Sequence, residues 1–82
     1  MLKREPFEIA NIYVPVKRRA TLEPARVDAL ADDILANGLK MPILVREDGA
    51  RFVLVEGLHR LEAAKKLGET TIDGYRVSSR KH

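Results

Sequence analysis

The chain has 82 residues, a formal net charge of +3 and no cysteine. This length supports one small domain with a modest core, and the missing cysteines exclude disulfides, thiolate metal sites and cysteine nucleophiles. No apolar run approaches the roughly 20 residues that cross a bilayer, and the charged start, residues 1–6, lacks a secretory apolar region, so we expect a cytoplasmic protein with no membrane partner.

The first predicted element is a strand over Phe7–Val14, which ends at Pro15. Three adjacent cations, Lys17, Arg18 and Arg19, follow in a predicted loop. Such a run is usually a solvated surface. It acquires a functional meaning only where the fold brings it to a binding site.

A helix is predicted from about Pro24 to Asn37. Its apolar side chains recur at helical spacing, and Pro24 is tolerated in a first turn, where its missing N–H has no partner to lose. Gly38 suits the left-handed residue that closes a helix. The aspartates on the opposite side are interpreted as a solvated face, and no metal site is predicted.

Two β-rich runs, Pro42–Arg46 and Arg51–Val55, flank the tight-turn pair Asp48-Gly49 and predict a β-hairpin. Their nearly continuous apolar content indicates that both faces are covered, at least in part. A last strand is predicted over Thr71–Val77. Residues 78–82 form a polar, basic tail that nothing in the sequence orders.

The sharpest functional pattern is the passage from the second hairpin strand into a helix over residues 58–67. The strand stops at Glu56-Gly57, so the first N–H groups of the helix and the positive end of its dipole form an anion site. His59 and Arg60 suit phosphate and lie in the first turn. Arg60 also falls on the apolar arc of the helix, where a charge is costly unless it is paired or binds an anion. The alternatives are an Arg60 that reaches water or an acidic partner, and a His59 that is merely exposed.

These elements predict one α+β domain over residues 1–82, with an ordered core over about residues 7–77. It should hold a small mixed sheet of about four strands, packed by two main helices. The predicted core residues are the apolar positions of these elements: Val27, Leu30, Ile34, Ile43, Val45, Val53, Val55, Leu61, Ala64 and Leu67.

A set of short motifs follows in order along the chain: Gly38-Leu39, Pro42-Ile43, Val45-Arg46, Gly57, Arg60, Ala63-Ala64-Lys65 and Leu67-Gly68. This set resembles the N-terminal domain of ParB-type partition proteins, a fold shared with sulfiredoxin and some free-serine kinases. The likeness spans roughly residues 7 to 77. It implies a ParB/sulfiredoxin-like fold for nearly the whole chain.

In the partition proteins a Gly-Glu-Arg-Arg turn holds the triphosphate of CTP, helped by basic residues after the first strand. Here the turn reads Gly57-Leu58-His59-Arg60, and the loop cations correspond to Arg18 or Arg19. The resemblance therefore implies that these residues bind a nucleoside triphosphate with Mg²⁺. CTP and ATP both remain open, because the turn is closer to that of sulfiredoxin and the serine kinases, which use ATP. Sulfiredoxin has its nucleophilic Cys where this chain has Leu58, so that chemistry is excluded.

Two functions of different classes follow from the resemblance. The first is a stand-alone ParB-like nucleotide-binding module, a switch or adaptor for a larger protein partner in DNA partition or plasmid functions. The second is a small phosphotransfer or nucleotide-hydrolysing enzyme of the serine-kinase type, with Glu56 as the nearest candidate catalytic base. A nuclease ranks third, because the clustered acidic residues of a two-metal site are missing.

Nucleic acid is a weaker expectation. Partition proteins continue into a helix-turn-helix DNA reader and a dimerisation domain, and this sequence stops before either. We therefore expect no sequence-specific DNA recognition. The basic tail predicts at most a weak, salt-sensitive association with nucleic acid.

Overall fold

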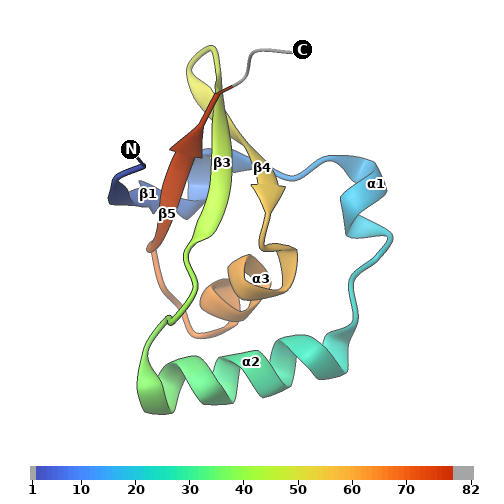
Figure 1. The fold of residues 1–82 in the computed structure, drawn as a ribbon. Coiled ribbons are helices and arrows are strands. Elements are labelled where there is room, and N and C mark those ends of the chain that lie inside the picture. Colours follow the sequence, from blue (N-terminus) through green and yellow to red (C-terminus); the bar gives the residue numbers. More distant parts are fainter. Residues whose placement is uncertain (1, 79–82) are drawn as a thin grey trace.

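The computed structural model describes residues 2–78, which fold around a five-stranded mixed sheet (Figure 1). In the order β1-β5-β3-β4-β2, the strands are β1 (Arg4–Glu8), β5 (Thr71–Val77), β3 (Ile43–Asp48), β4 (Arg51–Glu56) and β2 (Ile12–Tyr13). The helices are α1 (Val16–Arg19), α2 (Pro24–Asn37) and α3 (Leu58–Lys66), with a 3₁₀ turn, η1, at Ile9–Asn11. The predicted α+β class and mixed sheet are confirmed, with five strands in place of about four.

The predicted first strand, Phe7–Val14, is wrong as a single element. The structure divides this segment between the two edges of the sheet: β1 pairs antiparallel with β5, and β2 pairs in parallel with β4. Only the short turn η1 connects them. So short a connection can reach both edges because the sheet curls until its edges approach each other.

Phe7 of β1 and Phe52 of β4 demonstrate this curl. Their ring centroids lie 4.9 Å apart in an edge-to-face arrangement, although β5 and β3 separate the two strands within the sheet. In a flat sheet, three interstrand spacings of about 4.8 Å would hold these strands roughly 14 Å apart. The concave face of the sheet therefore encloses its own core.

The main core lies between this concave face and α3. Its largest fully buried side chains are Ile43, Val45, Leu54 and Leu61. Below α3, α2 packs through a second, smaller cluster that includes Val27 and Ala63, so the two helices form successive layers under the strands (Figure 1). Within residues 2–78, none of the helices combines the length and the apolar character that crossing a membrane requires.

Most of the predicted core positions are buried. Those with little exposed surface are Val27, Ile43, Val45, Val53, Leu61 and Ala64, whereas Leu30, Ile34, Val55 and Leu67 are half-buried. The prediction omitted four buried residues of the first segment: Phe7, Ile9, Ile12 and Val14. All four lie inside the curl, in the main core cluster. A single straight strand over residues 7–14 would not bring them together there.

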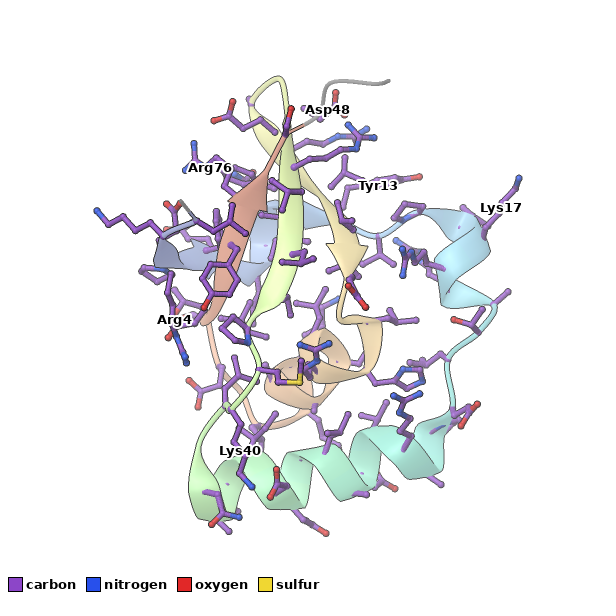
Figure 2. The ribbon with its side chains drawn as sticks, viewed as in Figure 1. Arg4, Tyr13, Lys17, Lys40, Asp48 and Arg76 are labelled. Atoms are coloured by element: carbon purple, nitrogen blue, oxygen red, sulfur yellow. The ribbon has the colours of Figure 1, made fainter. Side chains whose placement is uncertain are left out.

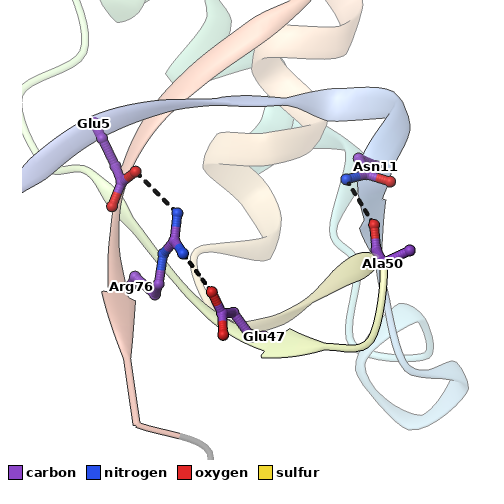
Figure 3. Close-up of polar contacts among 5 residues, drawn as sticks. All are labelled: Glu5, Asn11, Glu47, Ala50 and Arg76. Carbon is purple, nitrogen blue, oxygen red and sulfur yellow. Dashed lines mark hydrogen bonds and ion pairs between the residues drawn. The ribbon is translucent and has the colours of Figure 1, made fainter.

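The end of the curved sheet away from α3 is closed by Arg76 (Figure 3). Its guanidinium binds the carboxylate of Glu5 on β1 at 3.1 Å and also contacts Glu47 on β3. The same group lies 5.1 Å from the ring centroid of Phe52, in cation–π range. Charge and aromatic surface therefore cover this end of the core together.

The hairpin predicted from Asp48-Gly49 is confirmed: β3 and β4 pair antiparallel, with Asp48 opposite Arg51. In the turn of this hairpin, the carbonyl of Ala50 accepts a hydrogen bond from the side chain of Asn11 in η1 at 3.2 Å (Figure 3). Apart from Ser78, the expected basic tail lies outside the described residues.

Candidate functional site

A cavity of about 480 Å³ opens between the first turn of α3, the inner side of α2 and the connection from α2 to β3. Six of the predicted site residues line it: Arg18, Glu56, Gly57, Leu58, His59 and Arg60. The seventh, Arg19, lines a separate hollow beside Tyr13 and Arg51. The structure thus separates the two loop cations that the sequence left as alternatives.

Arg18 and Arg19 diverge because their segment is helical. The cationic run was predicted to be a loop, but it forms α1, and successive residues of a helix point about 100° apart. Arg18 therefore faces the cavity and Arg19 does not. Their neighbour Lys17 extends outward from α1 (Figure 2).

Gly57 makes the turn from β4 into α3. Its backbone has φ 112° and ψ 31°, a conformation that residues with a side chain rarely adopt. A Cβ at this position would lie 2.7 Å from Cγ2 of Ile43, a fully buried side chain. Leu58 is also buried, so at residues 57 and 58 only the backbone is available to a ligand in the cavity.

The beginning of α3 presents free donors. Its first intrahelical hydrogen bond runs from the N–H of Leu61 to the carbonyl of Gly57 at 2.9 Å, which leaves the N–H groups of residues 58–60 without helical acceptors. The first turn contains no acidic residue and has no side-chain cap. The positive end of the helix dipole is therefore not neutralised from within α3.

His59 connects α3 to the start of α2. Its Nε2 accepts a hydrogen bond from the backbone N–H of Glu23 at 3.0 Å, and Glu23 is the residue that precedes the first turn of α2. A ring nitrogen can accept only when it carries no proton, so the hydrogen of this neutral imidazole is on Nδ1. His59 also lines the cavity.

Arg60 braces the opposite end of α2. Its Nη1 donates to the backbone carbonyls of Met41 at 2.9 Å and Pro42 at 2.8 Å, both in the connection from α2 to β3. The sequence left open whether this charge meets an anion, water or an acidic side chain. The structure provides carbonyl oxygens instead. Within residues 2–78 these carbonyls bind Nη1, and Nε and Nη2 have no acceptor.

Arg26 is the site residue that sequence reasoning missed. It lines the cavity from α2 together with Leu30 and Ile34, which follow it at i+4 and i+8 on the same stripe of the helix. A cation in the first turn is disfavoured by the helix dipole, and that mismatch is the pattern that could have revealed it. Within the part of the chain that the structure describes, the side chains of Arg18 and Arg26 form no hydrogen bond or ion pair.

Two carboxylates also line the cavity. Asp33 is engaged, because it pairs with Lys40 at 3.6 Å and accepts a hydrogen bond from Asn37 at 2.9 Å; Figure 2 shows Lys40 beside α2. Glu56, at the end of β4, is exposed and has no partner within residues 2–78. Over the same residues, no three histidine, aspartate or glutamate side chains are grouped to hold a metal ion.

The arrangement is therefore rich in donors that suit an oxyanion, and poor in paired acid–base groups. Over residues 5–81, the chain matches the family model of the ParB N-terminal domain. It belongs to that family. The probable chromosome-partitioning protein ParB of Campylobacter jejuni is 36% identical over 58 residues, which are 71% of this chain and 21% of that protein. The chain thus spans about a fifth of the length of this curated relative.

Solved structures share the ParB/sulfiredoxin-like fold, which confirms the fold that the sequence predicted. Sulfiredoxin from Arabidopsis thaliana superposes with a TM-score of 0.84 at 30% identity, over 94% of this chain and 86% of its own. C-terminally truncated ParB from Caulobacter crescentus, complexed with CTP-gamma-S, gives 0.78 at 23% identity, over 98% and 46%. A free serine kinase in complex with ADP gives 0.78 at 17% identity, over 90% and 30%; at these identities the last two show the fold alone.

Proposed function

We propose that this ParB-like domain binds a nucleoside triphosphate, with the phosphate chain at the beginning of α3. The proposal rests on one observation: the free N–H groups of residues 58–60 share a cavity with the guanidinium groups of Arg18 and Arg26, which are unpaired within residues 2–78. Backbone donors at a helix start and arginine side chains are the groups that proteins use for phosphate. Two proteins of the same fold were solved with CTP-gamma-S and with ADP.

Each wall of the cavity has its own role in this proposal. The N–H groups that follow Gly57 hold the terminal phosphate, where a negative charge also satisfies the helix dipole. Arg18 from α1 and Arg26 from α2 neutralise the phosphate chain from two further elements. Arg60 holds the cavity in shape through Met41 and Pro42, and its Nε and Nη2 remain as donors.

Mg²⁺ accompanies the nucleotide in the proposal. Mg²⁺ in nucleotide sites is held by one or two carboxylates together with phosphate oxygens and water. Glu56 is the carboxylate suited to this role, because Asp33 is already occupied by Lys40 and Asn37. In the alternative enzyme, of the serine-kinase type, the same Glu56 is the catalytic base.

The apolar part of the cavity receives the base and ribose. Leu30, Ile34, Leu39 and Met41 line it, and a thioether side chain adapts to flat surfaces of different shape. Such a wall accepts cytosine and adenine alike, so CTP and ATP both remain candidates. The biological role that fits is a switch or adaptor for a larger protein partner in DNA partition.

A calorimetric panel of ATP, CTP, GTP and UTP with Mg²⁺ tests the proposal, followed by a phosphate-release assay on every nucleotide that binds. We expect saturable one-to-one binding of at least one nucleotide. Binding without phosphate release supports the module, whereas release, or transfer to a small hydroxyl acceptor, supports the enzyme. No heat with any of the four at millimolar concentration overturns the proposed function.

A further inference from the structure

The start of α2 is capped by a residue from another helix. Glu23, its N-cap residue, makes no side-chain cap hydrogen bond. In a capping box, the side chain at the third helical position accepts a hydrogen bond from the N-cap N–H. Here that position is Arg26, whose guanidinium has no acceptor. The N–H of Glu23 is bonded instead to Nε2 of His59, on α3.

The other nitrogen of the same ring is free for a ligand. With Nε2 accepting, the hydrogen of the neutral imidazole is on Nδ1, and this N–H has no partner within residues 2–78. His59 also lines the cavity beside the free N–H groups of α3. One ring can therefore donate toward the cavity and accept from α2 at the same time.

We propose that His59 is a positioning residue that bridges the bound nucleotide and α2: Nδ1–H donates to a phosphate oxygen while Nε2 accepts from the N–H of Glu23. This inference rests on the proposed nucleotide binding. Donation to an anion polarises the ring and makes its second nitrogen a better acceptor, because hydrogen bonds in a chain reinforce one another. Nucleotide binding thus tightens the start of α2.

A tighter start of α2 also affects the contact between Arg26 and the nucleotide. This residue is three positions after Glu23 on α2 and lines the same cavity, so fixing the first turn of α2 also fixes the backbone that carries its guanidinium. A doubly protonated His59 would act in the opposite way. Both of its nitrogens would be donors, the N–H of Glu23 would lose its acceptor, and the start of α2 would loosen when the nucleotide binds.

Nuclear magnetic resonance on the full chain distinguishes the two cases. The chain has two histidines, His59 and His82, so the imidazole nitrogens are readily assigned, and their chemical shifts report which nitrogen carries hydrogen. We expect hydrogen on Nδ1 of His59 with and without saturating Mg²⁺–nucleotide. We also expect several-fold slower hydrogen exchange at the Glu23 amide in the bound state. A doubly protonated His59 in the complex, or unchanged Glu23 exchange at saturation, overturns the inference.

Two variants separate donation from acceptance. His59→Gln keeps both a donor and an acceptor, whereas His59→Lys keeps only donors. At saturation with nucleotide, slow Glu23 exchange should persist in His59→Gln and be lost in His59→Lys. Equal Glu23 exchange in the two complexes overturns the bridge while leaving nucleotide binding in place. Absence of calorimetric binding to the wild-type chain instead removes the proposed function, and the bridge with it.

Discussion

Gly57 and Ile43 approach each other so closely that a Cβ on Gly57 would lie 2.7 Å from Cγ2 of Ile43. The contact is between the turn that begins α3 and the middle of the core, where Ile43 is 0% exposed. A side chain at residue 57 would strain the turn, because φ is positive there, and its Cβ would collide with the core.

Gly57→Ala should therefore lower the stability of the domain as well as any binding. Positive φ costs an alanine roughly 1–2 kcal/mol, and overpacking typically adds about 1–3 kcal/mol, so we expect a loss of about 2–5 kcal/mol in the free energy of unfolding. Gly49→Ala is the matched control, because Gly49 also has positive φ (62°) but nothing within 4 Å of its added Cβ. Denaturant titration of both variants measures the difference, and equal losses would contradict the contact with Ile43.

Leu61 provides a test of the helix faces. It is 0% exposed beneath the curved sheet, so Leu61→Ala should lower the free energy of unfolding by about 2–5 kcal/mol through lost burial and the cavity left behind. Leu35→Ala removes the same atoms from α2, where Leu35 is 75% exposed, and should change stability by no more than about 0.5 kcal/mol. Similar melting temperatures for the two variants would show that the face of α3 is wrongly assigned.

Local pattern was sufficient for much of this fold. The apolar periodicity with Pro24 and Gly38 predicted α2 with the bounds that the structure has, and Asp48-Gly49 located the hairpin. These features depend on residues that are close in sequence. The division of residues 7–14 between β1 and β2 depends instead on the curl of the whole sheet, which no local pattern records.

The candidate site divides in the same way. The strand–glycine–helix passage located the free N–H groups of α3, because they follow from the local chain alone. The acceptor role of His59 could not be predicted, since its partner Glu23 is 36 residues away in the sequence. Arg26 was missed for a related reason. It belongs to the site only because α3 lies across the cavity from it, and within its own segment it is simply a cation on a helix.

Arg60→Ala should affect both folding and binding. The change removes one cation from the cavity, which should weaken nucleotide binding. It also removes the two hydrogen bonds from Nη1 to Met41 and Pro42, and taking a charged donor away from two carbonyls costs about 1.5–3 kcal/mol. Thermal unfolding without ligand measures this loss, and calorimetry on the folded fraction measures affinity. An unchanged melting temperature would show that the two carbonyl contacts contribute nothing to stability.

Arg18 and Arg19 offer the cleanest test of the site, because they are adjacent, exposed and alike in charge. Within residues 2–78 neither guanidinium has a hydrogen bond or an ion pair, so replacing either by alanine should leave the melting temperature nearly unchanged. Only Arg18 lines the cavity. Loss of one charge-assisted contact with phosphate corresponds to about 1.5–3 kcal/mol, or roughly 10- to 150-fold in affinity.

Arg18→Ala should therefore weaken nucleotide binding by at least about tenfold, and Arg19→Ala should change it little, because both variants lower the net charge equally. Calorimetric titration of the two variants with the same Mg²⁺–nucleotide makes the comparison. Repeating it at higher salt separates a direct contact from general attraction, since distant charges are screened beyond about 10 Å at 0.1 M salt. If the two variants bind equally well, the phosphate chain does not lie where the free N–H groups of α3, Arg18 and Arg26 meet.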